Sequence, residues 1–120
     1  MSIANREHWL PRLKPLGSAA EFPYERTLSP VEASALRVGL WPRDMDDRWV
    51  VYLADTSLAM HRSWSGHAIY SIAFSRSPDG GGLLGPALVC SDGSIYRAEE
   101  QPRRDIEMVD YLLDRTIEHN

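Results

Sequence analysis

Strand-forming segments follow one another along the middle of the chain with only short turns between them, and this succession limits the fold more than any other feature. Residues 48–54, 58–62, 67–75 and 83–90 are rich in β-branched, aromatic and other apolar residues, and 94–97 is a shorter segment of the same kind. Strands joined by short turns pair antiparallel. No strand is followed by a crossover helix and a further strand, which excludes a doubly wound α/β fold. The sequence therefore predicts an antiparallel β-meander of three to five strands.

A helix is predicted on each side of these strands. Ser29-Pro30-Val31-Glu32 combines a capping residue, a proline suited to the first helical position and a glutamate that completes a capping box, so a short N-terminal helix is predicted at 30–38. A long C-terminal helix is predicted at 102–118, where apolar residues recur at helical spacing. Its outer face is expected to be acidic and solvated, with Asp105, Glu107, Asp110, Asp114 and Glu118. Both helices are expected to pack on the sheet, which gives a single α+β domain over residues 1–120.

Residues 1–28 are predicted to form an irregular N-terminal segment. A short amphipathic helix is expected within 1–14, although Pro11 interrupts its pattern, and several prolines and glycines indicate an irregular course at 15–28. The segment has no long apolar leader, and no stretch of the chain approaches the ~20 apolar residues that span a bilayer. Cys90 is the single cysteine and lies in an apolar run, which indicates a buried thiol in a reducing compartment. We therefore expect a cytoplasmic protein with no membrane partner.

Charge and motif content exclude several functional classes. The net charge is −4, and the twelve arginines and one lysine are scattered without a basic run, so no nucleic-acid partner is expected. Gly80-Gly81-Gly82 lacks the spacing and the following helix of a phosphate-binding loop and is predicted to be a hairpin loop. The chain has no cysteine pair, no His-Glu-x-x-His and no Gly-x-Ser-x-Gly. These absences favour a non-enzymatic protein without a cofactor, a metal site or catalytic residues.

The most distinctive motif is His61-Arg62-Ser63-Trp64-Ser65-Gly66-His67, at the tip of a predicted hairpin that runs from Asp46 to Tyr70. If residues 63–66 form the turn, Arg62 faces His67 across the strands and His61 faces Ala68, whereas a slip of one residue brings His61 opposite His67. Two histidines fall short of the three or four converging ligands of a metal site. Hydrogen bonds to backbone or water are therefore the expected role of both rings.

Arg62 and Trp64 have two interpretations. The first is an oxyanion or phosphate pocket, because a guanidinium binds such groups bidentately and an indole offers a stacking face. Its candidate ligand-binding residues are His61, Arg62, Ser63, Trp64, His67 and Tyr70. The second is structural, either a cation–π contact or an ion pair of Arg62 with Asp46, Asp47 or Asp55. The pocket requires Arg62 and at least one histidine to face an open concavity, so the orientation of Arg62 distinguishes the two.

Two features precede the first predicted strand. Asp44, Asp46 and Asp47 are interpreted as a solvated loop, because neighbouring carboxylates on an exposed turn rarely lose their contact with water. Trp41-Pro42 is interpreted as an apolar plug that leads into the sheet.

The stretch from Asp47 to Tyr70 resembles a motif of a family of small bacterial proteins to which no activity is assigned. The pattern in this chain is DRWxxYxxDxxLxxHRSWxGxxIY, and Ser65 stands where the family pattern has threonine. The resemblance implies either a toxin–immunity system or neighbouring proteins that act on ADP-ribose. The resemblance does not identify any site residue in this chain.

Two functional hypotheses follow. The first is a non-enzymatic binding, interaction or accessory protein of the immunity-like kind, with a protein partner. The second is a small ligand-binding domain or enzyme for a phosphorylated or nucleotide-like molecule, of which ADP-ribose is an example, that uses Arg62, Trp64, His61 and His67. Homodimerisation through an edge strand is a further expectation, because a short sheet has edges to protect.

Overall fold

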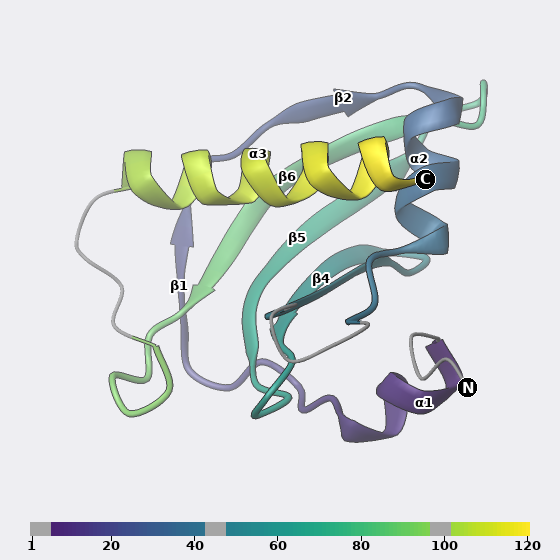
Figure 1. The fold of residues 1–120 in the computed structure, drawn as a ribbon. Coiled ribbons are helices and arrows are strands. Elements are labelled where there is room, and N and C mark those ends of the chain that lie inside the picture. Colours follow the sequence, from purple (N-terminus) through teal and green to yellow (C-terminus); the bar gives the residue numbers. More distant parts are fainter. Residues whose placement is uncertain (1–5, 43–47, 97–101) are drawn as a thin grey trace.

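The computed structural model describes residues 6–42, 48–96 and 102–120, and Figure 1 shows its fold. Within these ranges, helices accompany a six-stranded sheet. In chain order the elements are α1 (Arg6–Trp9), the 3-10 helix η1 (Leu10–Arg12), β1 (Ala19–Phe22), β2 (Arg26–Leu28), α2 (Pro30–Val38), β3 (Trp49–Leu53), β4 (Ser57–Arg62), β5 (Ala68–Arg76), β6 (Gly82–Cys90) and α3 (Pro102–His119).

The sheet is antiparallel and has the order β1-β6-β5-β4-β3, with β2 also paired to β6. Strands β3 to β6 are neighbours in chain order, so the predicted meander and the α+β class are confirmed. The prediction of three to five strands is wrong, because β1 and β2 lie in the stretch 15–28 that was expected to be irregular. Both are short and pair with a strand far along the chain, so no local periodicity marks them.

Strands β1 and β2 share the outer edge of β6. β1 pairs with residues 87–90 and β2 with residues 82–84. Between the two, Gly85 approaches the neighbouring chain so closely that a Cβ atom there would lie 1.9 Å from the carbonyl oxygen of Tyr24. Its φ of 128° also favours glycine. The two short strands thus follow one long strand in tandem.

Residues 93–95 form a turn. Of the one or two strands predicted at 83–90 and 94–97, only the first is present in the described residues. The backbone N–H groups of Ile95 and Tyr96 donate to the carbonyl oxygen of Asp92, at 3.0 and 2.9 Å. The Asp92 carboxylate accepts from the backbone N–H and the hydroxyl of Ser94, at 2.9 and 2.7 Å. This local turn chemistry takes up the backbone groups that a strand would have used. Arg97 lies outside the described residues.

Helix α2 begins and ends where the sequence predicts. Ser29 Oγ accepts from the Glu32 N–H at 3.1 Å, and Glu32 Oε1 accepts from the Ser29 N–H at 2.9 Å, so the predicted capping box is present. Gly39 ends the helix with a φ of 87°. The side-chain amide of Asn120 donates to the Gly39 carbonyl oxygen at 2.9 Å, which fastens the end of α3 to α2 (Figure 1).

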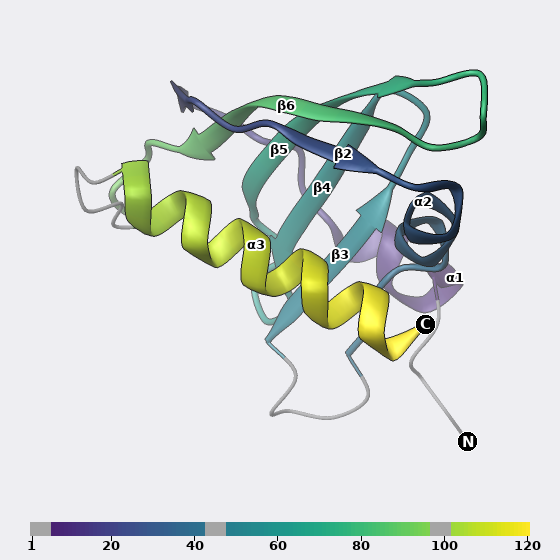
Figure 2. The ribbon, with the colours of Figure 1, turned by 90° about the horizontal axis from the view of Figure 1, so that it is seen from above.

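Helix α3 crosses one face of the sheet (Figure 2), and the prediction that its acidic side is solvated is wrong in part. Asp110 accepts a hydrogen bond from the Tyr24 hydroxyl at 2.6 Å, and burial together with this bond raises the pKa of Tyr24. Asp114 forms an ion pair with Arg26 at 2.8 Å. Asp105 is buried and is described with the site below. The segment that carries β1 and β2 lies along this side of α3, which the sequence pattern does not indicate.

The core lies between the sheet and the two longer helices. Helix α3 contributes Val109, Leu112 and Leu113, all fully buried. Cys90 is buried, as predicted. Trp41 stacks on Tyr52 of β3 with ring centroids 5.5 Å apart, as expected of an apolar plug.

The N-terminal segment lies beside the closed end of the β4–β5 hairpin (Figure 1). The helix expected within 1–14 is present as α1 followed by η1, which contains Pro11, while residues 1–5 lie outside the described part. The Lys14 N–H donates to the Gly66 carbonyl oxygen at 2.8 Å. This contact joins the N-terminal segment to the tip of the hairpin.

Candidate functional site

The β4–β5 hairpin closes through residues 63–66, as predicted. His61 pairs with Ala68, and the Arg62 N–H donates to the His67 carbonyl oxygen at 3.0 Å. The alternative in which His61 faces His67 is therefore wrong. Because successive side chains of a strand point to opposite faces, His61 and Arg62 are directed to opposite sides of the sheet.

His61 supports the hairpin tip on the face turned away from α3. Its ring is buried and stacks on Tyr52 with centroids 6.1 Å apart, and Nδ1 lies 3.1 Å from the Gly66 carbonyl oxygen. Burial lowers the pKa of His61, so the ring is neutral at pH 7. A carbonyl oxygen only accepts, so Nδ1 carries the proton and donates it to Gly66. His61 therefore has the structural role expected of a hydrogen-bonded histidine.

Arg62 lies on the α3 side of the sheet and rests on an aromatic base. Its guanidinium carbon is 4.9 Å from the ring centroid of Trp49, and Trp49 in turn stacks on Tyr70 with centroids 6.2 Å apart. Stacking occupies the face of a guanidinium and leaves its N–H groups in the plane able to donate. Among the described residues no carboxylate forms an ion pair with Arg62, and Asp46 and Asp47 lie outside them.

Tyr70 anchors this base in the core. Its side chain is fully buried, and its hydroxyl donates to Asp105 Oδ1 at 2.8 Å and lies 3.1 Å from the Tyr96 hydroxyl. Burial and these two contacts raise the pKa of Tyr70, so the hydroxyl keeps its proton and holds the Asp105 carboxylate. The row Arg62–Trp49–Tyr70–Asp105 thus links the hairpin tip to the first turn of α3.

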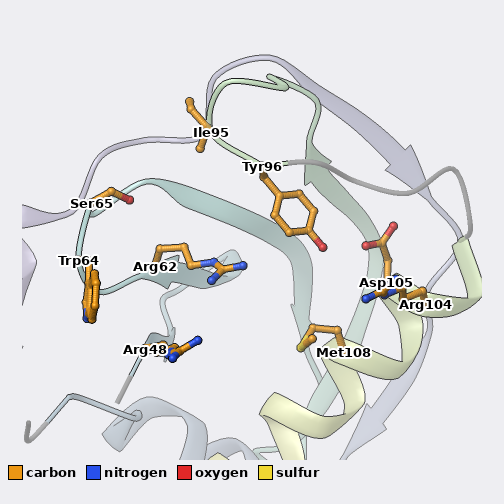
Figure 3. A pocket seen from close by; sticks show the side chains of 9 residues that line it. All are labelled: Arg48, Arg62, Trp64, Ser65, Ile95, Tyr96, Arg104, Asp105 and Met108. Carbon is orange, nitrogen blue, oxygen red and sulfur yellow. The ribbon is translucent and has the colours of Figure 1, made fainter. Parts of the chain in front are cut away.

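The side chain of Arg62 faces a cavity of about 680 Å³ between the hairpin tip, Ile95 and Tyr96, and the start of α3 (Figure 3). Three guanidinium groups reach its wall, from Arg48 just before β3, from Arg62 of β4 and from Arg104 of α3. Trp64, which is 73% exposed, stands at its rim. The remaining lining residues are Ser65, Ile95, Tyr96, Asp105 and Met108. We call this concavity the arginine pocket.

The arginine pocket contains two of the six predicted site residues, Arg62 and Trp64. His61 and His67 do not line it, so the expectation that a histidine accompanies Arg62 is not met. Tyr70 lies beneath the wall, where it holds Asp105. Ser63 is buried, and its backbone N–H donates to the Arg48 carbonyl oxygen at 2.9 Å, which fixes the Arg48 backbone next to the hairpin tip.

Sequence reasoning did not find the other half of the pocket wall. Arg48 carries a signal, because it stands beside Trp49, which pairs with Arg62 across β3 and β4. Arg104 and Met108 carry none, since nothing in the local pattern of α3 tells which part of the sheet its first turns cover. The sequence predicts a strand at Tyr96, but the turn before it directs the Tyr96 side chain to Tyr70.

The arrangement suits the binding of an anion. Guanidinium groups recognise phosphate and carboxylate oxygens through paired, charge-assisted hydrogen bonds. Three such groups face one carboxylate, Asp105, whose charge is already held by Tyr70. In the described part of the chain, no group of three or more histidine, cysteine, aspartate or glutamate side chains is arranged to hold a metal ion.

A wider concavity of about 960 Å³ lies at the β1–β2 edge, lined in part by Glu21, Glu25, Asp110 and Asp114. Its single arginine, Arg26, is 2.8 Å from Asp114 and 3.6 Å from both Asp110 and Glu32. An anion would meet repulsion there, so the smaller arginine pocket is the better candidate in spite of its size.

No helix in the described residues has the length and apolar character needed to cross a membrane. Comparison of the chain with protein-family models, with curated proteins and with solved structures finds no match. The resemblance of residues 47–70 to a family of small bacterial proteins therefore stays a prediction, as do the cytoplasmic location and the immunity-like role. The arginine pocket is the feature on which a functional assignment rests.

Proposed function

We propose that this protein binds a small anionic molecule with a planar ring, of the phosphorylated or nucleotide-like class, and that it does so without catalysis. The observation that carries the proposal is the convergence of three guanidinium groups on one cavity whose rim is an exposed indole. Phosphate oxygens would accept from Arg48, Arg62 and Arg104, and a planar ring would stack on Trp64. The volume of the pocket is within the range of small-molecule sites, about 300–1,000 Å³.

Binding is favoured over catalysis by the state of the groups nearest the pocket. His61 is buried on the opposite face and donates to Gly66, so it is not placed to accept a proton from a ligand. Asp105 does line the pocket, but Tyr70 already donates to its Oδ1. A general base must reach the proton that it removes and must have an acceptor atom available. His61 does not reach the pocket, and Oδ1 of Asp105 already accepts from Tyr70.

A thermal-shift screen tests the proposal. The probes are inorganic phosphate, nucleoside mono- and diphosphates, ADP-ribose and divalent metal ions. A ligand at 100 times its dissociation constant adds about 2.7 kcal/mol to the free energy of unfolding, which raises the melting temperature by several degrees. We expect nucleotide-like anions to give this rise and Arg62→Gln to abolish it.

Arg76→Gln is the matched control, because Arg76 is an exposed arginine at the far end of β5 and does not line the arginine pocket. The control variant should respond as the wild type does. A screen in which no anion raises the melting temperature, or one in which Arg62→Gln responds as fully as Arg76→Gln, would refute the proposal.

A protein-binding role of the immunity-like kind is the second candidate, and an exposed apolar strip on α2 favours it. Val31 and Val38 are 77% and 60% exposed and lie two helical turns apart on one side of the helix. Exposed apolar residues that cluster are typical of protein-contact surfaces. Titration with the product of the neighbouring gene tests this candidate: Val31→Glu should weaken the complex and Arg62→Gln should leave it intact, and no complex with the wild type would exclude it.

A further inference from the structure

A second cavity adjoins the arginine pocket. It has a volume of about 430 Å³ and lies between β3 and the middle of α3. Arg48, Arg104 and Met108 line both cavities, so the two share a wall that carries two guanidinium groups. The two cavities are therefore neighbours that contact the same three side chains.

Each cavity is lined by two aromatic side chains. Trp64 and Tyr96 line the first, and Trp49 and Tyr111 line the second. Tyr111 is 57% exposed, so its ring is accessible from the second cavity without rearrangement of the core. Both cavities therefore combine aromatic rings with the guanidinium groups of the shared wall.

Two charged residues, Glu107 and Arg115, line the second cavity and not the first. Glu107 is an exposed carboxylate on α3. A carboxylate accepts hydrogen bonds from sugar hydroxyls, as an acidic residue does in many dinucleotide sites. The second cavity therefore offers an acceptor for the hydroxyl groups of a nucleoside.

We infer that the two cavities form one bipartite site for a dinucleotide, a molecule in which a diphosphate joins two nucleosides. This inference rests on the proposed function and extends it. The diphosphate would lie at Arg48 and Arg104, one base would stack on Trp64 and the other on Tyr111. Glu107 would accept from the ribose hydroxyls of the second nucleoside.

Titration calorimetry of the full chain with three probes tests the inference. The probes are inorganic pyrophosphate, adenosine diphosphate, and diadenosine diphosphate, in which two adenosines share one diphosphate. Stacking of one base is worth about 1–3 kcal/mol, which corresponds to roughly 5- to 150-fold in affinity. We expect diadenosine diphosphate to bind at least about fivefold more tightly than adenosine diphosphate, although it carries less charge, and pyrophosphate to bind most weakly.

Tyr111→Ala isolates the second cavity. It should remove most of the advantage of diadenosine diphosphate and leave the affinity for adenosine diphosphate unchanged, whereas Tyr111→Phe should keep the stacking face and the advantage. Leu88→Ala, at a part-exposed residue of β6 that lines neither cavity, is the control.

The outcomes distinguish a failure of the bipartite site from a failure of the arginine pocket as an anion site. Equal affinities for the two nucleotides, or no effect of Tyr111→Ala, overturn the bipartite site and leave the anion pocket standing. Failure of every probe to bind overturns both. A short adenosine oligonucleotide that binds more tightly than diadenosine diphosphate overturns the inference in favour of single-stranded nucleic acid.

Discussion

Gly66 is the residue at which the hairpin tip has the least steric freedom. Its φ is 76°, and a Cβ atom built on it would lie 2.1 Å from the carbonyl oxygen of Arg12. A left-handed conformation costs a residue with a Cβ about 1–2 kcal/mol, and the clash must in addition displace the N-terminal segment from the hairpin. The His-Arg-Ser-Trp-Ser-Gly motif therefore has a physical reason to end in glycine.

We predict that Gly66→Ala lowers the free energy of unfolding by at least about 2 kcal/mol, measured by urea denaturation. Gly93→Ala is the control, because no heavy atom lies within 4 Å of a Cβ at Gly93. A loss for Gly66→Ala as small as that of the control would mean that the contact with residues 12–14 contributes little to stability.

His61 predicts a dependence of stability on pH. Burial lowers the pKa of His61 in the folded chain, while in the unfolded chain the pKa returns to about 6.5. The unfolded state therefore binds more protons below pH 6.5, and stability falls as the pH drops from about 6.5 towards the lower pKa of the folded state. Stability above about pH 7 should not depend on this residue's titration.

The measurement is the free energy of unfolding at pH 7.5 and at pH 5.5, for the wild type and for His61→Gln. The wild type should lose more stability on acidification than the variant, even though the variant is less stable at pH 7.5 because it lacks the ring that stacks on Tyr52. Equal losses in the two proteins would show that another group titrates in this range.

At the scale of elements, α3 is held to the β1–β2 segment by Arg26 and its carboxylates. Arg26 lies 2.8 Å from Asp114 and 3.6 Å from Asp110 and from Glu32, and its side chain is only 22% exposed. Exposed ion pairs contribute about 0–1 kcal/mol each, so the cluster as a whole has a modest effect. Its partners are half-exposed, which makes the effect sensitive to salt.

We predict that Arg26→Gln lowers the free energy of unfolding by about 1 kcal/mol at low ionic strength and by less in 1 M sodium chloride. The result follows because the variant leaves three carboxylates close together without a counter-charge. Arg76→Gln should change stability little at either salt concentration. A loss for Arg26→Gln that does not depend on salt would point to packing of the arginine side chain and not to its charge.

The elements that sequence reasoning predicts correctly are those with strong local signals. The capping box at Ser29 and the dense β-branched run of β3 are properties of a few neighbouring residues, and both were placed well. Strands β1 and β2 were missed because their partner, β6, lies far along the chain and three of the four residues of β1 are exposed. Pairing of this kind depends on the tertiary fold and leaves no periodic pattern.

The candidate site was likewise predicted only where its residues belong to one local motif. Arg62 and Trp64 stand in one short motif with recognisable chemistry, and they do line the pocket. The histidines of that motif were predicted to join them, but alternation along β4 turns His61 to the other face. Arg104 and Met108 come from α3, and only the path of that helix over the sheet brings them to the pocket.

At the scale of the whole molecule, one side of the β4–β5 hairpin tip makes structural contacts and the other side lines the arginine pocket. The N-terminal segment and His61 hold the tip on one side through the Gly66 carbonyl oxygen. The path of α3 across the sheet brings its first turns to the other side, where the arginine pocket forms (Figures 2 and 3). The net charge of the chain is −4, so the positive charge at the pocket is local. A local positive site on a negative protein attracts small anions more effectively than extended nucleic acids.

The central claim is that anions bind at the arginine pocket, and the indole N–H signals of the tryptophans test it most directly. Titration of the ¹⁵N-labelled protein with adenosine diphosphate follows these signals one by one in two-dimensional NMR spectra. Trp64 lines the pocket and Trp49 lies under Arg62. Trp9 and Trp41 donate their indole N–H to Pro42 and Val38, line neither cavity and serve as internal references.

The account predicts that the Trp64 and Trp49 signals move and saturate with one affinity while those of Trp9 and Trp41 stay in place, and that Arg62→Gln prevents the movement. Signals of Trp64 and Trp49 that do not move at millimolar adenosine diphosphate, or movement centred on Trp9 and Trp41, would contradict it.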